Sequence, residues 1–302
     1  MTSPFGRLQH FLDDSEIQEI MIIAGRHLWV EDASGIHFIE DLSTSDVAMV
    51  LEAISRYSQR RTDLLSPITD AVLPCGSRAC VVIAPIAVDG ATVSIRKFAR
   101  RIHPLAAFGT HHSIDIVRRL IAERKNVVIA GATSTGKTSL LSSVTQHFSS
   151  NERIVCVEDT SELKFTHPHV VRLQTRPPNS EGNGAIALHD LVRASLRLRP
   201  DRLIVGEVRS HEALDMLLAL SSGHRGCWST IHATSAFDTL QRLNDIVVRG
   251  SIQWSTEQVQ RLVTSSVDAI VYLHREPNRR RRITEIVQRN GTEYQHIFGG
   301  HE

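Results

Sequence analysis

The stretch Gly131-Ala132-Thr133-Ser134-Thr135-Gly136-Lys137-Thr138 decides the fold of this 302-residue chain. Its spacing, G-x-x-x-x-G-K-[S/T], is that of a phosphate-binding loop (P-loop). The glycines let the backbone turn tightly, so that amide N–H groups point at phosphate oxygens. The lysine adds a positive charge beside the outer phosphates, and the hydroxyl of Thr138 can ligate Mg²⁺. We therefore expect these eight residues to bind a nucleotide.

The residues on either side of the loop support this interpretation. Asn126-Val127-Val128-Ile129-Ala130 is a short apolar run that is typical of a buried strand. Ser139 to His147 continues as a helix, whose N-terminus would face the loop and favour an anion. Strand, loop and helix in this order distinguish a nucleotide site from an ordinary glycine-rich turn.

Composition and charge limit the class of protein. With 41% hydrophobic and 22% charged residues, the chain is typical of a globular protein with one large or two ordinary domains. Its formal net charge of +1 gives no overall electrostatic attraction for nucleic acid, so we expect no direct nucleic-acid contact. The cysteines lack the spacing of a zinc site and are expected to be reduced thiols: Cys75, Cys80, Cys156 and Cys227.

No stretch approaches the roughly 18 consecutive apolar residues of a membrane span. Met1 to Ile23 also lacks the basic and apolar regions of a signal peptide. We expect a cytoplasmic protein whose membrane association is peripheral, through partners.

The first part of the chain predicts a small α+β domain over residues 1–98. One helix is expected at Thr44 to Arg60, after possible caps at Ser43 to Ser45. Strands are expected at residues 17–23, 27–31, 71–73, 79–86 and 91–98. The basic stretch after this domain, with Arg100, Arg101 and Pro104, predicts a linker over residues 99–110.

The remainder, residues 111–302, predicts an α/β domain with a mostly parallel sheet and helices on both faces. Strands are expected at residues 126–130, 153–157, 170–174, 202–205 and 227–231, and helices at 139–147, 188–198 and 211–220. The proline- and glycine-rich stretch from Thr175 to Ala185 is expected to be a loop. The run Arg279 to Arg282 is interpreted as a solvated turn, with a nucleic-acid or lipid contact as the alternative.

Two strand ends offer the carboxylates that nucleotide hydrolysis needs. Leu203-Ile204-Val205-Gly206-Glu207 resembles a Walker B strand in which Gly206 stands at the usual magnesium aspartate, so Glu207 is the candidate for polarising the attacking water. Glu158, at the end of the strand that begins near Arg153, could replace the lost aspartate in the magnesium shell, through water. Ligands bind at the carboxyl edge of such sheets. The alternative for each acidic residue is a helix cap.

Two histidines follow the Walker B helix. His224 and His232 flank the strand expected at residues 227–231, which suits a sensor of the outer phosphate. The alternative is an ordinary hydrogen-bonded core histidine. A metal pair is not favoured, because no third ligand has a fitting spacing.

Four motifs together resemble the secretion ATPase superfamily, the hexameric traffic ATPases of type II and type IV secretion, conjugation and pilus assembly. They are the P-loop, Val157 to Leu163, Arg197 to Arg209, and Gly223 to Ala233. In that family they are the Walker A motif, the Asp box, a Walker B motif without its aspartate, and the His box. Residues 66–78 and Ile95-Arg96-Lys97-Phe98 also resemble its N-terminal domain, which is PAS-like.

The resemblance implies a RecA-like ATPase domain with ATP and Mg²⁺ as ligands. It implies that Glu207 is the catalytic base or orients water, and that Glu158 supports the metal and the water. His224 and His232 would sense or stabilise the nucleotide state. Arg96, with Arg78 as the second candidate, would reach the γ-phosphate from the N-terminal domain, so that ATP holds the two domains together and phosphate loss releases them.

The branch within the family stays open at this point. Residues 176–182, 213–217 and 282–286 look most like the ATPases of Tad/Flp pili, the CpaF type. The compact length resembles the conjugative ATPases of the TrbB and VirB11 type. The resemblance implies a homo-hexamer at an inner-membrane secretion or pilus platform protein. A DNA translocase and a catalytically silent ATP-gated assembly module are the alternatives.

Overall fold

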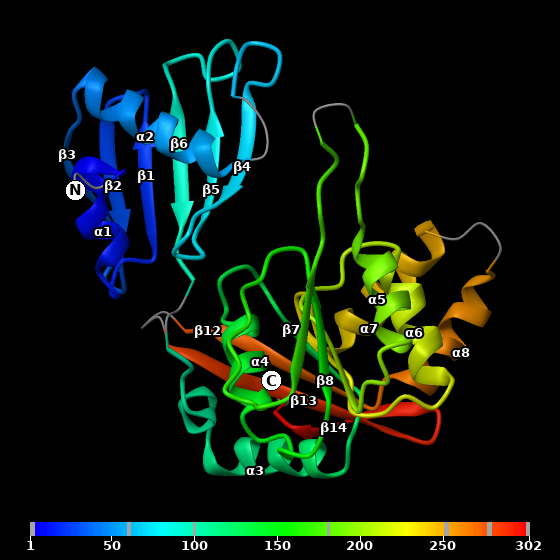
Figure 1. The fold of residues 1–302 in the computed structure, drawn as a ribbon. Helices are drawn as coiled ribbons and strands as arrows, with labels where there is room; N and C mark the ends of the chain where they lie inside the picture. The colour runs from blue at the N-terminus through cyan, green and yellow to red at the C-terminus, as the bar shows by residue number, and fades with distance from the viewer. Residues whose placement is uncertain are drawn as a thin grey trace. The chain divides into compact units, whose positions relative to one another are not determined.

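The structure is a computed structural model that describes residues 4–58, 62–98, 101–179, 182–250, 254–276 and 280–299. The chain divides into two compact units, the first formed by Met1–Arg100 with Asn179–Asn183 and the second by Arg101–Pro178 with Gly184–Glu302. The division between Arg100 and Arg101 falls inside the stretch predicted to be a linker. In Figure 1 the first unit runs from blue to cyan.

The first unit is an antiparallel six-stranded sheet in the order β3-β2-β1-β6-β5-β4, packed against helix α2. Its elements are η1 (Gly6–Leu8), α1 (Gln9–Asp13), β1 (Glu19–Ile23), β2 (His27–Glu31), β3 (Ile36–Asp41), α2 (Thr44–Tyr57), β4 (Ile68–Val72), β5 (Arg78–Val82) and β6 (Thr92–Arg96). Alternate residues of β1 and β2 are buried, since one face of the sheet meets the core and the other does not.

Helix α2 begins where its sequence predicts. Ser43 caps it, accepting a hydrogen bond from the Asp46 amide, while the Asp46 side chain accepts one from the Ser43 amide. The side chains of Val47, Val50 and Ile54 are buried in the core of the first unit, as their helical spacing predicts. The helix ends at Tyr57, and the rest of the predicted helix includes Gln59 and Arg60, outside the described residues.

The second unit is an eight-stranded sheet in the order β14-β13-β12-β7-β11-β10-β8-β9. Strands β9, β8, β10, β11, β7 and β12 are parallel, and β13 and β14 are antiparallel, which confirms the mostly parallel sheet. Its elements are η2 (Leu105–Phe108), α3 (His111–Ala122), β7 (Val127–Gly131), α4 (Lys137–Thr145), β8 (Ile154–Glu158), β9 (Val170–Gln174), α5 (Leu188–Leu196), β10 (Arg202–Val205), α6 (Glu212–Ser221), β11 (Trp228–His232), α7 (Ala236–Gly250), α8 (Thr256–Ser266), β12 (Ala269–Arg275), β13 (Arg281–Asn290) and β14 (Glu293–Phe298).

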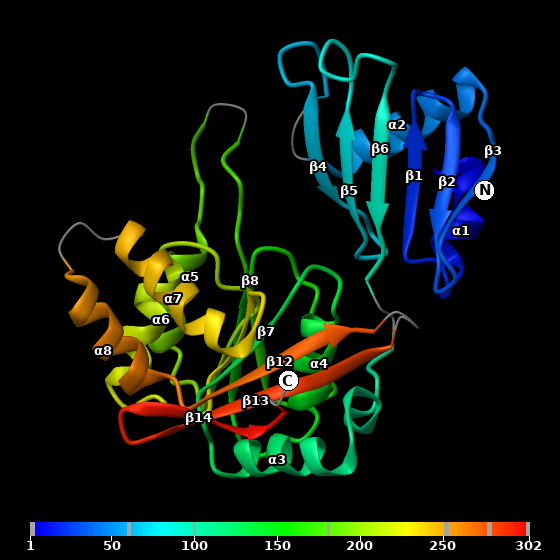
Figure 2. The ribbon, with the colours of Figure 1, turned by 180° about the vertical axis from the view of Figure 1, so that it is seen from behind.

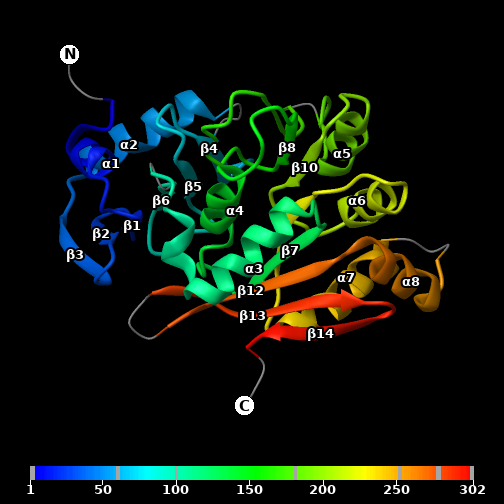
Figure 3. The same cartoon turned by 90° about the horizontal axis from the view of Figure 1, so that it is seen from below.

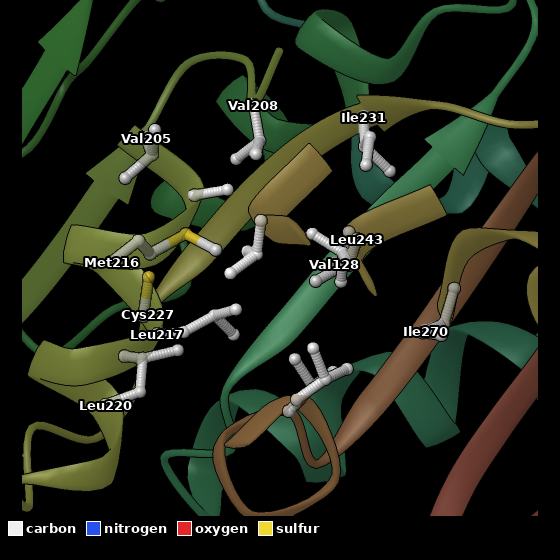
Figure 4. Packing of buried hydrophobic residues seen from close by; sticks show 14 of the residues in the cluster. Val128, Val205, Val208, Met216, Leu217, Leu220, Cys227, Ile231, Leu243 and Ile270 are labelled. Atoms are coloured by element: carbon white, nitrogen blue, oxygen red, sulfur yellow. The ribbon is translucent and has the colours of Figure 1, made fainter. Parts of the chain in front are cut away.

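Helices cover both faces of this sheet. On one face, Val128 and Ala130 of β7 pack with residues of α5 to α8. On the other face, Val127 and Ile129 pack with residues of η2, α3 and α4, so every residue of β7 is buried. Figure 3 shows α3 and α4 beside β7 and β12. Figure 4 shows the first of these cores, where Met216 of α6 lies near Val205 and Val208.

The described part of the stretch after β9 is a loop, as expected, with one antiparallel bridge between Arg176 and Ile186; its two limbs run side by side in Figure 2. The linker differs from the prediction. Within the predicted linker, Leu105 and Phe108 of η2 are buried in the core that also holds α3 and α4. None of the helices in the described part of the chain is both long and apolar enough to cross a membrane.

Candidate nucleotide site

The P-loop joins the end of β7 to the start of α4, as the sequence predicts. Gly131 has φ +154°, and a Cβ there would lie 2.5 Å from the Leu273 carbonyl oxygen, so only glycine fits. Gly136, with φ +93°, is the N-cap of α4. The amides of the first turn of α4 lack helical partners and can donate to phosphate oxygens. The loop is therefore built for an anion.

The Lys137 side chain lies across the loop and is only 6% exposed as a residue. Its Nζ donates to the carbonyl oxygens of Gly131 (3.0 Å) and Ala132 (2.8 Å) and lies 3.2 Å from Nδ1 of His232. Because an ammonium group has no acceptor, Nδ1 must be the acceptor in that contact. The Thr135 hydroxyl also donates to the Ala132 carbonyl oxygen, at 2.9 Å. These contacts hold the ammonium group of Lys137 against the first residues of the P-loop and beside His232.

The strand order brings further predicted site residues to the edge that carries the P-loop. Strand β11 pairs with β7, β10 pairs with β11, and β8 pairs with β10, all in parallel. His232 is in register with Gly131, and Val205 is in register with Val157. The carboxyl ends of the four strands thus lie at one edge, where His232, Glu207 and Glu158 follow one another outward from the P-loop.

His232 lies between the lysine and Glu207. Its Nε2 is 2.8 Å from Oε1 of Glu207, and the other side of that carboxylate pairs with the Arg209 guanidinium. Burial, and then the nearby charge of Lys137, lower the pKa of His232 below the ordinary histidine value. A neutral ring with Nδ1 accepting from Lys137 carries its proton on Nε2, toward Glu207.

The Glu207 carboxylate is contacted at both oxygens. Its Oε1 is buried and lies 2.8 Å from Nε2 of His232, although no contact of this atom meets hydrogen-bond geometry. A buried acceptor whose donor is poorly aligned is costly, so a better-aligned donor such as water would stabilise it. Glu207 is the residue that the sequence predicts to polarise the attacking water.

Glu158 explains the glycine that departs from the Walker B pattern. A Cβ at Gly206 would lie 2.8 Å from Cγ of Glu158, so the Glu158 side chain fills the space that a residue-206 side chain would need. Glu158 is 3% exposed, and its Oε1 accepts from the amides of Glu162 and Leu163, both at 2.9 Å. Burial raises its pKa, against the lowering effect of those amides.

The prediction that His224 binds the nucleotide is wrong for the nucleotide of its own chain. His224 precedes β11 and its Nδ1 lies 3.1 Å from the Ala219 carbonyl oxygen, at the end of α6. Its own carbonyl oxygen accepts from Asn126, at the start of β7. His224 therefore lies at the amino edge of the sheet, a strand length of about 17 Å from the P-loop edge. The spacing in sequence could not show that the strand separates the two histidines.

The two predicted arginines belong to the first unit. Arg78 of β5 and Arg96 of β6 are cross-strand partners, and both are exposed. Arg78 also lies 3.5 Å from Asp70. The pairing puts two guanidinium groups side by side on one face of the sheet, where they can meet an anion together. Their role at a nucleotide stays a prediction.

The residues present fit a nucleotide with Mg²⁺. Among the described residues, no group of three or more His, Cys, Asp and Glu side chains could hold a metal ion alone. Mg²⁺ would instead be held by the hydroxyl of Thr138 and by phosphate oxygens, with Glu158 and Glu207 acting through water. The carboxylate of Glu207 and the donors of the P-loop are the groups that such a complex needs.

Two residues of this site were missed by the sequence prediction. Arg209 pairs with Glu207 and lies 3.8 Å from Asp159. Arg281 lies against the P-loop at Gly136.

The run Arg279 to Arg282 was interpreted as a solvated turn. That interpretation is wrong for Arg281 and Arg282, because both belong to strand β13. Arg279 lies outside the described residues. The β-branched residues among 283–287 (Ile283, Thr284, Ile286 and Val287) were the available signal for that strand.

Comparison with known proteins agrees with this architecture. The sequence model of the family described as "Type II/IV secretion system protein" matches residues 5–297. The chain is 30% identical to the conjugal transfer protein TrbB of Rhizobium radiobacter, over 96% of this chain and 89% of that protein. It is 31% identical to the type IV secretion system protein PtlH of Bordetella pertussis, over 94% of each. Among solved structures, the VirB11 ATPase of the Brucella suis type IV secretion system, in complex with sulphate, shares 25% identity and a TM-score of 0.53, over 94% of this chain and 93% of that one.

Proposed function

Because the chain belongs to the type II/IV secretion system protein family, we propose that it is an ATPase that converts ATP hydrolysis into mechanical work for secretion or pilus assembly. The observation that carries this proposal is the line of contacts from Lys137 through His232 to Glu207. These contacts join Lys137, which would hold the outer phosphates, to the Glu207 carboxylate, which would activate water. They run across the carboxyl ends of β11 and β10. Nucleotide binding alone would need only the P-loop.

In the proposed reaction, Lys137 and the P-loop amides hold the β- and γ-phosphates. Mg²⁺, when bound with the nucleotide, neutralises part of the phosphate charge. The Glu207 carboxylate accepts a hydrogen bond from the attacking water and aligns it with the γ-phosphate. His232 keeps the carboxylate and the lysine at fixed positions, and Arg209 holds the other carboxylate oxygen. Glu158 orders water beside the metal.

We propose that motion follows from arginines outside the P-loop domain. Arg96, with Arg78 beside it, would contact the γ-phosphate when the first unit closes on a nucleotide, and would lose that contact when phosphate leaves. The family resemblance supports a homo-hexameric ring, located in the cytoplasm and bound peripherally to an inner-membrane platform protein. Both are part of this proposal.

Two branches are candidates for the process that is powered. The sequence motifs near residues 176–182 and 282–286 favour pilus assembly of the Tad/Flp type. Conjugative or type IV secretion is the second candidate, and it is supported by TrbB and PtlH, whose lengths this chain nearly spans. Deleting the gene and scoring pilus filaments and plasmid transfer separately distinguishes them, since each branch predicts the loss of only one.

The test of the ATPase itself is phosphate release by the purified protein. Lys137→Ala should abolish ATP turnover, because the outer phosphates lose their cation. Lys125→Ala is the matched control: Lys125 precedes β7 at the opposite edge of the sheet, pairs at 3.8 Å with Glu123, and should leave turnover unchanged. Equal turnover by wild type and Lys137→Ala would contradict the proposal.

A further inference from the structure

Arg281 reaches the P-loop from a side that the proposed mechanism does not use. It begins β13, where it pairs with Arg275 of β12, and β12 runs parallel to β7 with Leu273 in register with Gly131. The first residues of β13 are thus brought to the edge that carries the loop.

The Arg281 side chain packs directly on the loop and on the first turn of α4. A Cβ at Gly136 would lie 2.6 Å from Cδ of Arg281 and 3.4 Å from its Nε, so glycine leaves the room that the side chain occupies. The guanidinium Nη1 lies 3.5 Å from the Ser139 hydroxyl, at the long limit of a hydrogen bond. Ser139 is the third residue of α4, where the backbone N–H groups lack helical partners.

The two cations approach the loop from opposite sides. In the strand order, β7 has β11 on one side and β12 on the other. Lys137 contacts His232 of β11, and His232 contacts Glu207, which follows β10 on the same side of β7. The γ-phosphate bond is therefore expected to be cleaved on the β11 side of the P-loop. Arg281 comes from the β12 side. A nucleotide whose γ-phosphate faces β11 therefore directs its α-phosphate end toward Arg281.

We propose that Arg281 binds the α-phosphate end of the nucleotide, the part that ATP and ADP share, and thereby sets the affinity for both. This inference rests on the proposed nucleotide site. A planar guanidinium beside the backbone N–H groups of a helix N-terminus forms a strong phosphate contact. Because ADP keeps this contact after hydrolysis, Arg281 contributes to retaining the product and not to breaking the γ-phosphate bond.

Arg282 provides a matched control. It is the next residue of β13, its side chain points to the opposite face of the strand, and its Nε lies 3.6 Å from Glu276. A substitution there removes the same charge from the same strand and leaves the P-loop contact in place.

The experiment is titration of ATP and of ADP, each with Mg²⁺, against the full-length protein. Arg281→Gln should raise the dissociation constants for ATP and for ADP by about tenfold or more, and by the same factor. Arg281→Lys should restore part of the affinity, and Arg282→Gln should change neither constant. Unfolding midpoints without nucleotide show whether the variants are folded.

Three results would overturn the inference. One is an unchanged dissociation constant for ADP. Another is a loss confined to ATP, which would move Arg281 to the γ-phosphate. The third is tighter binding of ATP and ADP by Arg281→Gln, which would show that the Arg281 side chain occupies space that the nucleotide needs. If Arg281→Gln does not fold, Arg281→Lys is the test. Lysine keeps the charge but lacks the planar guanidinium, so an ADP affinity equal to that of the wild type would reject the proposed contact. Failure of the wild type to bind either nucleotide would instead reject the proposed function.

Discussion

His232 shows how much of the site depends on one protonation state. Its Nδ1 accepts from Lys137 only while the ring is neutral, and burial and the lysine charge keep the pKa of His232 below the ordinary value. As pH falls through that lowered pKa, Nδ1 gains a proton and two positive charges meet. The contact that joins the P-loop to Glu207 is then lost.

The pH dependence of turnover tests this residue. Wild-type turnover should fall on the acid side with a midpoint below about 6.5, the value of an unperturbed histidine. His232→Gln should be about tenfold slower at pH 8, since the amide replaces the ring imperfectly, and the acid fall should shift. An identical acid fall in His232→Gln would assign the titration to another group, with Glu158 the next candidate, because burial raises its pKa.

Gly206 tests whether Glu158 fills the place of the missing aspartate. Gly206→Ala puts a Cβ 2.8 Å from Cγ of Glu158, so we expect a loss of about 1–3 kcal/mol in the free energy of unfolding, together with slower turnover. Denaturant unfolding measures the first quantity. In a Glu158→Ala background, Gly206→Ala should cost little further stability, because the crowding disappears with the carboxylate, while turnover stays low. Two independent, additive losses of stability would contradict the account.

At the scale of single residues, the sequence was sufficient wherever a residue acts through its neighbours in the chain. The P-loop residues follow from spacing alone, because the backbone of one loop makes the site. Arg281 and His224 depend on which strands become neighbours and at which edge they end. The order and direction of the strands depend on pairing between distant parts of the chain. The sequence therefore did not predict that Arg281 lies at the P-loop or that His224 lies at the opposite edge of the sheet.

Asn126 holds several elements together at the amino edge of the second sheet. Its side chain donates to the carbonyl oxygen of Ser266 at the end of α8 and accepts from the amide of Cys227 before β11. It also lies 3.4 Å from the His224 carbonyl oxygen. The residue is 5% exposed, so water cannot replace these bonds without rearrangement.

Asn126→Ala should therefore lower the free energy of unfolding by about 2 kcal/mol or more, because buried backbone groups lose their partners. Chemical denaturation of the whole protein measures this. Asn290→Ala removes an exposed amide bond to Gln295 and should cost little by comparison. Equal losses in the two variants would show that Asn126 is not the anchor described here.

The elements also show where hydrophobic periodicity is a sufficient signal. The strands β7, β8, β10 and β11 are almost wholly buried and carry runs of apolar or β-branched residues, and each was expected within a residue or two of its observed bounds. Strand β3 was missed because it is exposed along almost its whole length, so its sequence has no buried alternate face. An edge strand of this kind is fixed by its pairing with β2 and not by its own pattern.

At the scale of the whole molecule, the first unit is proposed to take part in hydrolysis. Arg96→Gln should reduce ATP turnover by about a hundredfold or more, because the transition-state charge on the γ-phosphate loses an opposing cation. ADP binding should be unchanged. Arg56→Gln, in α2 of the same unit and paired with Glu52, is the control and should keep wild-type turnover. Normal turnover in Arg96→Gln would limit the active site to the second unit.

The central claim is that Glu207 activates water at a site that binds ATP without it. Its most direct test is one experiment on Glu207→Gln, measuring ATP binding by equilibrium titration and phosphate release on the same sample. The account predicts that the ATP dissociation constant stays within a fewfold of wild type, while phosphate release falls by about a hundredfold or more. Phosphate release at the wild-type rate would contradict the claim. Loss of ATP binding would assign Glu207 a structural role.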